Sequence, residues 1–467
     1  MSPSVSVLPG GLRVCVESVP QYGRGLAAVA LTVAAGGDDD PAGRHGTAHL
    51  VEHLMFPRSG GGSADPAGEG YAALVAGAGG VCNAETHRDH TVFHTTVPAE
   101  SLPDALAWEA RRLLGFAPTE DVIRTETDVI GEEIRGAGDA GRYWESALGA
   151  LYPGSRDSFG TPAELAGITP GEVEAFFRAH YTAPRMVLSV VGDVDPAGVM
   201  GIVGEVFAGV GEVRPVGEAR AAGAARAAGE ARAAEEIRAA REIRTAEEIR
   251  TATEIRAAEE ARTAREIRTA PLPSGRPGVA LGHPLPDPVA DRPAYLAQAV
   301  LAQVLGRSRL PALARSARDG RRLTSATVTC GYHGQWLASA APDLTLAVLG
   351  RAPGTAVGAA VDIWRSVLRA VAEGPLPEAE HRRAVNSLLV AWHRQADSLP
   401  TRAVALGRDA LLLPGSAGPD ALPAELRRTT PAEVAAAARA LLEGPVTVTE
   451  LAPQADTELA PQKGTVG

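Results

Sequence analysis

Hydrophobic and polar positions follow two kinds of pattern along the chain, and both kinds occur in each half. Strand-like apolar runs lie between segments with the 3.6-residue apolar period of amphipathic helices. In the first half, strands are predicted at Leu12–Val16, Ala27–Ala34, Val92–Val97 and Met186–Val191, and helices at Thr47–Phe56, Leu102–Leu114, Pro118–Arg135 and Pro170–His180. In the second half, strands are predicted at Val279–Leu281, Ser325–Thr329 and Leu344–Leu349, and helices at Ala294–Leu305 and around 356–372, 377–396 and 402–413. Because strands and helices do not alternate strictly, the pattern predicts an α+β fold with largely antiparallel sheets.

A six-residue repeat separates the two halves. Units such as EEIRAA and REIRTA recur between residues 217 and 270, and no Gly or Pro occurs from Glu230 to Ala270. A step of six residues turns a helix through about 600°, so the isoleucines of the repeat spread over several faces and form no coiled-coil stripe. We expect a solvated single helix or a disordered linker here, with a partner-binding helix as the functional alternative. The predicted organisation is an N-terminal domain (1–216), this linker (217–270), a similar C-terminal domain (271–453) and a polar tail (454–467).

Composition and charge exclude several classes of function. The chain has 467 residues, too many for one ordinary core, and a formal net charge of −11 without a basic patch, which argues against nucleic acid and anionic membranes. No run of about 18 apolar residues occurs, and the N-terminus lacks the features of a signal peptide. Three cysteines without a CxxC pair fit a reducing compartment. We therefore expect a soluble cytoplasmic protein.

The segment with the clearest chemistry is Gly46-Thr-Ala-His-Leu-Val-Glu-His-Leu-Met-Phe56. On a helix, His49 and His53 lie one turn apart on the same face, about 6 Å apart at Cβ, so both imidazoles can bind one metal ion. Glu52 borders that face and is placed to take a proton from a metal-bound water. Two histidines and a carboxylate at this spacing predict a hydrolytic zinc site.

A catalytic zinc usually has three protein ligands, and the best third candidate is Glu133. It lies in a predicted helix two turns after Glu126, so these two carboxylates share a face, whereas Glu132 points about 100° away. We expect Glu126 either to orient one of the zinc ligands without being one of the three ligands itself, or to help bind the zinc.

The order HLVEH reverses the commoner HExxH spacing and resembles the pitrilysin/insulinase family of metallopeptidases. The similarity extends over about residues 8–213 and more weakly over 279–450. The segments that carry it include Gly46-Thr-Ala, Gly79-Gly-Val-Cys-Asn-Ala84, the pair Glu126 and Glu133, Gly160-Thr-Pro and Val191-Gly-Asp-Val.

The resemblance implies two similar domains, each a mainly antiparallel sheet packed with helices. It implies one Zn²⁺ per chain, bound by His49, His53 and Glu133, with Glu52 as the catalytic base. It further implies that Asn83 and Ala84 lie on a strand that binds an extended peptide substrate by edge-strand addition. The expected activity is that of a zinc endopeptidase acting on short or unfolded peptides, in peptide maturation or in general turnover.

The chain departs from the family pattern in its second half. Active relatives use an arginine and a tyrosine, seven residues apart, to hold the substrate carbonyl and its oxyanion. Arg318 aligns with the arginine and is expected to support the oxyanion, but Ser325 aligns with the tyrosine, and Tyr332 is fourteen residues from Arg318. We therefore expect a second pitrilysin-like subunit, in a heterodimer, to supply an arginine/tyrosine pair, with a homodimer as the alternative.

Two other functions remain open: a non-catalytic scaffold, as in some relatives, and a zinc hydrolase of another class.

Four other histidines and one cysteine are not expected to take part in the site. His87, His90 and His94 are expected to form no second zinc site, because residues four apart on a strand are about 13 Å apart. Cys82 is expected to be a packing residue, and His45 is expected to be exposed.

Overall fold

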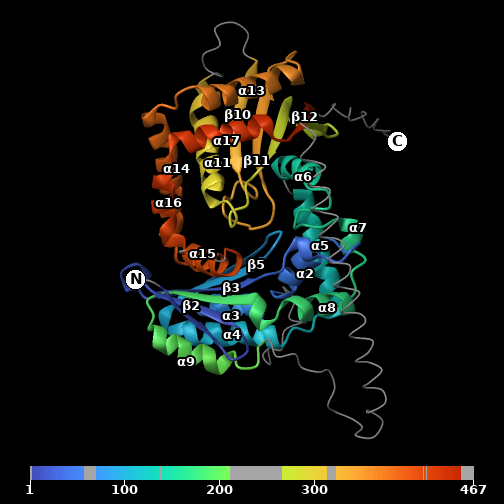
Figure 1. The fold of residues 1–467 in the computed structure, drawn as a ribbon. Coiled ribbons are helices and arrows are strands. Elements are labelled where there is room, and N and C mark those ends of the chain that lie inside the picture. The colour runs from blue at the N-terminus through green and yellow to red at the C-terminus, as the bar shows by residue number, and fades with distance from the viewer. Residues whose placement is uncertain are drawn as a thin grey trace, which may run out of the picture.

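The computed structural model describes residues 3–56, 70–136, 139–210, 266–312, 322–413, 415–416 and 418–453, and these form two six-stranded sheets, one in each half (Figure 1). The first sheet has the order β1-β2-β6-β3-β5-β4, in which only β2 and β6 run parallel. Its strands are β1 (Ser4–Val7), β2 (Arg13–Ser18), β3 (Leu26–Val33), β4 (Val81–Thr86), β5 (Thr91–Pro98) and β6 (Met186–Gly192). The predicted α+β class with mainly antiparallel sheets is confirmed.

The second sheet repeats this plan. Its order is β10-β11-β9-β12-β7, and β8 also pairs with β12; the pairings of β12 with β7 and β8 are parallel. Its strands are β7 (Glu266–Arg268), β8 (Leu272–Ser274), β9 (Gly278–Pro284), β10 (Leu323–Cys330), β11 (Leu344–Arg351) and β12 (Val446–Pro453). Strand β7 lies within the range predicted as linker, so the second domain begins earlier than residue 271. The remainder of the repeat and the tail predicted at 454–467 lie outside the described residues.

The helices cover the sheets and close two main hydrophobic cores, one per half. Those of the first half are α1 (Pro20–Gly23), α2 (Thr47–Leu54), α3 (Tyr71–Gly77), α4 (Leu102–Leu114), α5 (Glu120–Gly136), α6 (Asp139–Leu151), α7 (Pro162–Leu165), α8 (Pro170–His180) and α9 (Pro196–Val206). Those of the second half are α11 (Arg292–Val304), α13 (Val357–Glu373), α14 (Glu378–Ala396), α15 (Leu399–Leu412), α16 (Leu422–Arg428) and α17 (Pro431–Glu443). The helices and strands predicted from the apolar pattern are all present, with ends shifted by a few residues. The pattern did not predict the helices α1, α3, α6, α7, α9, α16 and α17 or the strands β1, β4, β7, β8 and β12.

Each half sends one helix onto the sheet of the other half. Helix α6 follows the first-half helix α5 but packs against β9 and β12, and helix α15 belongs to the second half but packs against β3 and β6 (Figure 1). The crossing of α6 is close: a Cβ on Gly282 of β9 would lie 2.7 Å from Cβ of Ala147. The two halves are therefore interlocked through their helices.

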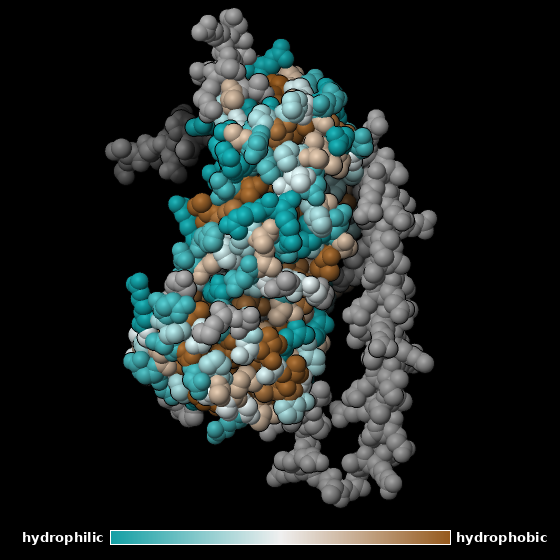
Figure 2. All heavy atoms as spheres, turned by 60° about the vertical axis from the view of Figure 1, so that its left-hand side comes forward, coloured by the Kyte–Doolittle hydropathy of each residue, from teal (hydrophilic) through white to brown (hydrophobic). Residues whose placement is uncertain are grey.

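None of the helices that the structure describes is long and apolar enough to cross a bilayer. On the face drawn in Figure 2, hydrophobic residues form small groups between hydrophilic ones.

Candidate metal centre

Helix α2 presents the HLVEH motif because its N-terminus and its apolar face are both fixed. The carboxylate of Asp40 accepts hydrogen bonds from the backbone N–H groups of Gly46 (2.6 Å) and Ala48 (2.7 Å), two donors that the helix itself cannot satisfy. Leu50 and Leu54 are buried in the core of the first half. The opposite side of the helix is left to face α5 and the end of β4.

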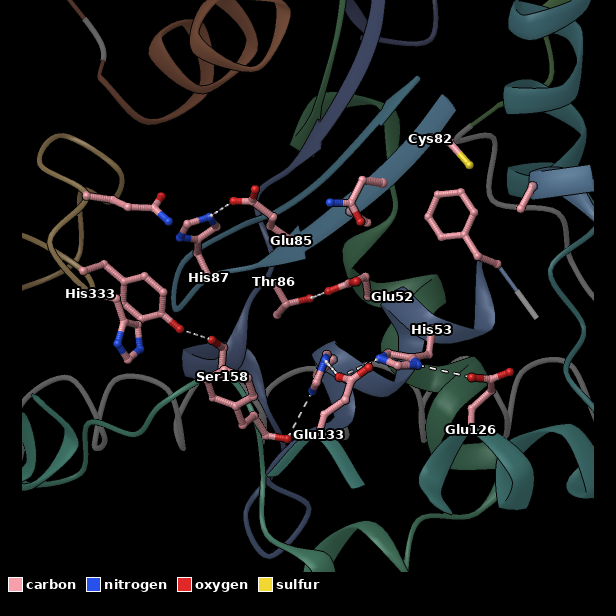
Figure 3. Close-up of a pocket in the computed structure, with 18 residues that line it drawn as sticks. Glu52, His53, Cys82, Glu85, Thr86, His87, Glu126, Glu133, Ser158 and His333 are labelled. Carbon is pink, nitrogen blue, oxygen red and sulfur yellow. Dashed lines mark hydrogen bonds and ion pairs between the residues drawn. The ribbon is translucent and has the colours of Figure 1, made fainter. Parts of the chain in front are cut away.

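Three side chains from α2 and α5 converge on one point (Figure 3). Oε2 of Glu133 lies 3.7 Å from Nε2 of His49 and 3.5 Å from Nε2 of His53. Two atoms bound to one tetrahedral zinc at about 2.1 Å are roughly 3.4 Å apart, so the spacing and the donor types both fit this ion. These three residues are the one group within the described ranges that could hold a metal ion.

The second nitrogen of each imidazole is also anchored. Nδ1 of His53 lies 3.2 Å from Oε2 of Glu126, and Nδ1 of His49 lies 3.3 Å from the carbonyl oxygen of Phe159. A hydrogen bond donated from Nδ1 leaves the lone pair on Nε2, which is the nitrogen that faces Glu133. Burial, together with the neighbouring His53, lowers the pKa of His49 to about 4 and keeps its imidazole in the neutral form that binds metals.

Glu52 lies beside this group and is held by the end of β4. Oγ1 of Thr86 donates a hydrogen bond of 2.5 Å to Oε2 of Glu52 (Figure 3). Burial raises the pKa of Glu52, although the hydrogen bond from Thr86 opposes the shift. A desolvated carboxylate with a raised pKa is a stronger base than one in water.

Strand β4 forms both the edge of the first sheet and one wall of the site. Only β5 pairs with it among the described strands, so β4 is an edge strand of the described sheet. Its side chains alternate: Thr86 and Ala84 lie on one face, and Asn83 and Glu85 on the other. The cavity that contains the three convergent side chains has a volume of about 580 Å³ and is lined along β4 by residues 82–86, including Asn83 and Ala84.

The second half contributes to the same cavity three residues that the sequence did not predict there. Tyr332, His333 and Gln335, in the turn between β10 and β11, line its wall. Tyr332 is fourteen residues from Arg318 and not seven, so the spacing in the family pattern did not predict a role for it. Arg318 lies outside the described residues, and Ser325 lies in β10 and does not line this cavity.

The expectation that His45 is exposed is wrong. The residue is 4% exposed and its ring lies between two carboxylates, with Nδ1 3.2 Å from Asp40 and Nε2 2.9 Å from Asp157. Burial alone would lower the pKa of His45, but the hydrogen bonds to Asp157 and Asp40 outweigh it and raise the pKa to about 9. The burial of His45 between two carboxylates could not be predicted from the sequence, because Asp157 lies 112 residues away in the chain.

The other residues that were set aside contribute no second metal group within the described part of the chain. The rings of His87 and His90 are stacked with centroids 4.4 Å apart, and His94 lies in β5. Cys82 packs against a small apolar cluster around Tyr71 and Val75, and burial raises the pKa of its thiol.

Comparison with known proteins identifies the family. Residues 16–137 match the model of the insulinase family, peptidase family M16, and residues 167–388 match the model described as the peptidase M16 inactive domain. The chain belongs to the M16 peptidase family. The resemblance inferred from the HLVEH motif and its companion segments is thereby confirmed.

The M16 relatives include proteins named as zinc proteases. The chain is 31% identical over 212 residues to an uncharacterized zinc protease of Mycobacterium tuberculosis, which covers 44% of this chain and 47% of that protein. It is 29% identical over 197 residues to a probable mitochondrial-processing peptidase subunit beta of Arabidopsis thaliana, covering 41% of this chain and 36% of that protein. The matched region thus spans about half of the length of these curated relatives or less.

Solved structures share this fold over nearly the whole chain. A protease from Helicobacter pylori superposes with a TM-score of 0.72 at 18% identity, covering 97% of this chain and all of that one. The first half of the periplasmic protease PqqL from Escherichia coli gives a TM-score of 0.67 at 15% identity, with 96% and 92% of the two chains covered. Both halves of the chain therefore match this fold.

Proposed function

We propose that this chain is a zinc-dependent endopeptidase that hydrolyses peptide bonds in short or unfolded peptides. The observation that carries the proposal is the convergence of His49, His53 and Glu133 on one point, with the partly buried carboxylate of Glu52 beside it. The names of the curated relatives support zinc as the metal.

The proposed roles follow from the contacts of each side chain. His49, His53 and Glu133 would hold one Zn²⁺, which when bound lowers the pKa of a coordinated water toward about 7 and polarises a carbonyl group. Glu52 takes a proton from the attacking water and passes it to the leaving amine, a role typically worth 10²- to 10⁴-fold in rate. Glu126 and the Phe159 carbonyl keep the two imidazoles in the orientation that the metal requires.

We propose that the edge of β4 opposite β5 binds the substrate backbone. A peptide that pairs with this edge as an additional strand runs directly past Thr86 and Glu52, because β4 ends beside α2. Asn83 and Ala84 would contact that peptide. Only an extended segment can pair in this way, which is why short or unfolded peptides are favoured over folded proteins.

We further propose a heterodimer in which this chain is the zinc-carrying subunit. The support is the serine at the position where active relatives have a tyrosine, and the fact that several relatives are named as the beta subunit of a processing peptidase. A missing oxyanion donor costs about 10²- to 10³-fold in rate, so a partner with an arginine/tyrosine pair would restore that activity. Full peptidase activity of the purified chain by itself would contradict this part of the proposal.

Metal analysis combined with one substitution tests the proposed activity. The purified chain should contain about one zinc, and Glu52→Gln should retain the zinc but lose cleavage of an unstructured peptide, in the presence of the partner if one is required. Glu132→Gln is the matched control, since Glu132 is a neighbouring carboxylate that is 77% exposed and pairs with Arg135. An unaltered protein that contains no zinc and cleaves no peptide would favour the alternative of a non-catalytic scaffold. Unchanged cleavage by Glu52→Gln would instead refute the role of Glu52 as the base.

A further inference from the structure

The turn between β10 and β11 connects the second half of the molecule to the metal site. The hydroxyl of Tyr332 shares a hydrogen bond with Oγ of Ser158, and both residues are buried (Figure 3). Ser158 directly precedes Phe159, whose carbonyl oxygen lies 3.3 Å from Nδ1 of His49. A short chain of contacts therefore runs from the second half to one of the proposed zinc ligands.

Tyr332 has a fixed position in this chain of contacts. Its side chain is 5% exposed and lies between the rings of His87 (centroids 5.1 Å apart) and Trp144 (4.9 Å). The turn that carries it is tight: Gln335 N–H donates to the carbonyl of Tyr332 (2.8 Å), and a Cβ on Gly331 would lie 2.5 Å from the carbonyl oxygen of Gln335. Gly331 has φ = +85°, a conformation that glycine adopts without strain.

The segment that follows the turn is bound to the first half. The carboxylate of Asp89 accepts hydrogen bonds from the backbone N–H groups of Ala340 (2.7 Å) and Ala341 (3.0 Å), and Tyr152 donates to the carbonyl of Asp343 (3.2 Å). These contacts hold the two halves together but do not lead to a metal ligand. Among the described residues, the second half reaches the segment in contact with His49 through the hydrogen bond of the Tyr332 hydroxyl and through the ring of His333, whose centroid lies 6.4 Å from that of the Phe159 ring.

We propose that Tyr332 is a positioning residue of the metal site, and that through Ser158 it holds the Phe159 carbonyl where it accepts the Nδ1–H of His49. Asp157 fixes the same segment from the other side, by accepting hydrogen bonds from the N–H groups of Phe159 (2.9 Å) and Gly160 (3.3 Å). The region that matches the inactive-domain model thus has a role at the metal site through a hydroxyl group that contacts no metal. This inference rests on the proposed function, because it requires that His49 binds zinc.

The test compares zinc binding by the full chain and three variants. Tyr332→Phe and Ser158→Ala each remove one hydroxyl of the pair, and Tyr152→Phe removes a hydroxyl at the same interface that does not lead to His49. The zinc dissociation constant is measured by competition with a chromophoric chelator. The absorption bands of the Co²⁺-loaded protein report the ligand geometry, and urea unfolding in EDTA reports the stability of each metal-free protein.

Tyr332→Phe and Ser158→Ala should each weaken zinc binding by about three- to tenfold and shift the Co²⁺ bands, because partners of a ligand typically contribute 10- to 100-fold and this contact is one step further away. The double variant should bind zinc no more weakly than the weaker-binding single variant, since both changes break the same hydrogen bond. Tyr152→Phe should bind zinc within twofold of the unaltered protein.

Three results would overturn the inference: zinc binding by Tyr332→Phe equal to that of the unaltered protein, equal losses in Tyr152→Phe and Tyr332→Phe, or additive losses in the double variant. If Tyr332→Phe does not fold, the comparison of Ser158→Ala with Tyr152→Phe decides. An unaltered chain that binds no zinc is a different result, and it would refute the proposed function itself.

Discussion

Nδ1 of His53 lies 3.2 Å from Oε2 of Glu126, a carboxylate whose side chain is 1% exposed. The same imidazole faces Glu133 with Nε2, at 3.5 Å. Glu126 and Glu133 are two helical turns apart on α5, so one face of a single helix contacts both nitrogens of one ring. The ring is therefore held in one orientation before any metal binds.

Loss of the Glu126 charge should weaken zinc binding. Glu126→Gln preserves the shape of the side chain but removes the carboxylate that accepts the Nδ1–H of His53, and we expect the zinc dissociation constant to rise by about tenfold. Competition with a chelator measures the change. Glu132→Gln, on the same helix but in solvent, should leave zinc binding unchanged. Equal effects of the two substitutions would show that the contact between Glu126 and His53 has no influence on the metal.

The hydroxyl of Thr86 should affect catalysis more than zinc binding. Thr86→Val removes the hydrogen bond of 2.5 Å to Glu52, and we expect kcat on an unstructured peptide to fall by about tenfold or more because the base is less well oriented. Zinc content should stay at that of the unaltered chain. Thr86→Ser retains a hydroxyl and should recover most of the rate; a serine variant as slow as the valine variant would argue against an orienting role.

Local periodicity was sufficient to predict one part of the site, and long-range contacts determine the rest. His49, Glu52 and His53 lie within two turns of one helix, so their common location follows from helix geometry alone. The position of Glu133 required the resemblance to the family as well as the spacing from Glu126. Tyr332 could not be placed in this way, because 174 residues separate it from Ser158 and no spacing rule connects them.

The exchange of α6 and α15 was also beyond prediction from the sequence. An amphipathic pattern shows that a helix buries one face, but it does not show which sheet that face covers. Helix α6 follows α5 directly in the chain, yet its partners are β9 and β12, more than 120 residues further on. The same limit explains His45, whose burial depends on Asp157 in a distant segment.

The pair of carboxylates around His45 should make stability depend on pH above neutrality. The pKa of His45 is raised from an ordinary value near 6.5 to about 9 in the folded protein, because the hydrogen bonds to Asp157 and Asp40 outweigh burial. A raised pKa means that the folded state binds the proton more tightly. The resulting stabilisation, at most about 3 kcal/mol, is complete below about pH 6.5 and is lost as the pH rises through about 9.

A substitution separates this contribution from those of other groups. Burial, together with the nearby Asp157, raises the pKa of Glu145 to about 8, so its ionisation lowers stability over part of the same pH range. The free energy of unfolding in urea with EDTA, measured at pH 6 and pH 10 for the unaltered protein and for His45→Gln, isolates the histidine. The unaltered protein should lose more stability between these pH values than His45→Gln does. Equal losses would contradict the charged state assigned to His45.

The crossing of α6 over the second sheet should tolerate no added methyl group at Gly282. Gly282→Ala would place a Cβ 2.7 Å from Cβ of Ala147 and 2.6 Å from Oγ1 of Thr447, so the helix must shift away from β9. We expect a loss of about 1–3 kcal/mol in the free energy of unfolding, the usual result of overpacking. Gly201→Ala, at an exposed position in α9 with nothing within 4 Å of the new Cβ, should instead stabilise the protein by about 0.5–1 kcal/mol.

A second substitution at this crossing shows whether Gly282→Ala destabilises the protein through a clash with Ala147 or because β9 tolerates no substitution at this position. Ala147→Gly by itself should destabilise the protein, since it places glycine inside a helix and removes a buried methyl group. Combined with Gly282→Ala it removes the closest opposing atom, so the double variant should be more stable than the sum of the two single losses predicts. Urea unfolding of the four proteins measures this coupling. Additive losses would mean that α6 does not pack on β9 as closely as the Cβ distance indicates, and that the two halves are interlocked less tightly than their exchanged helices imply.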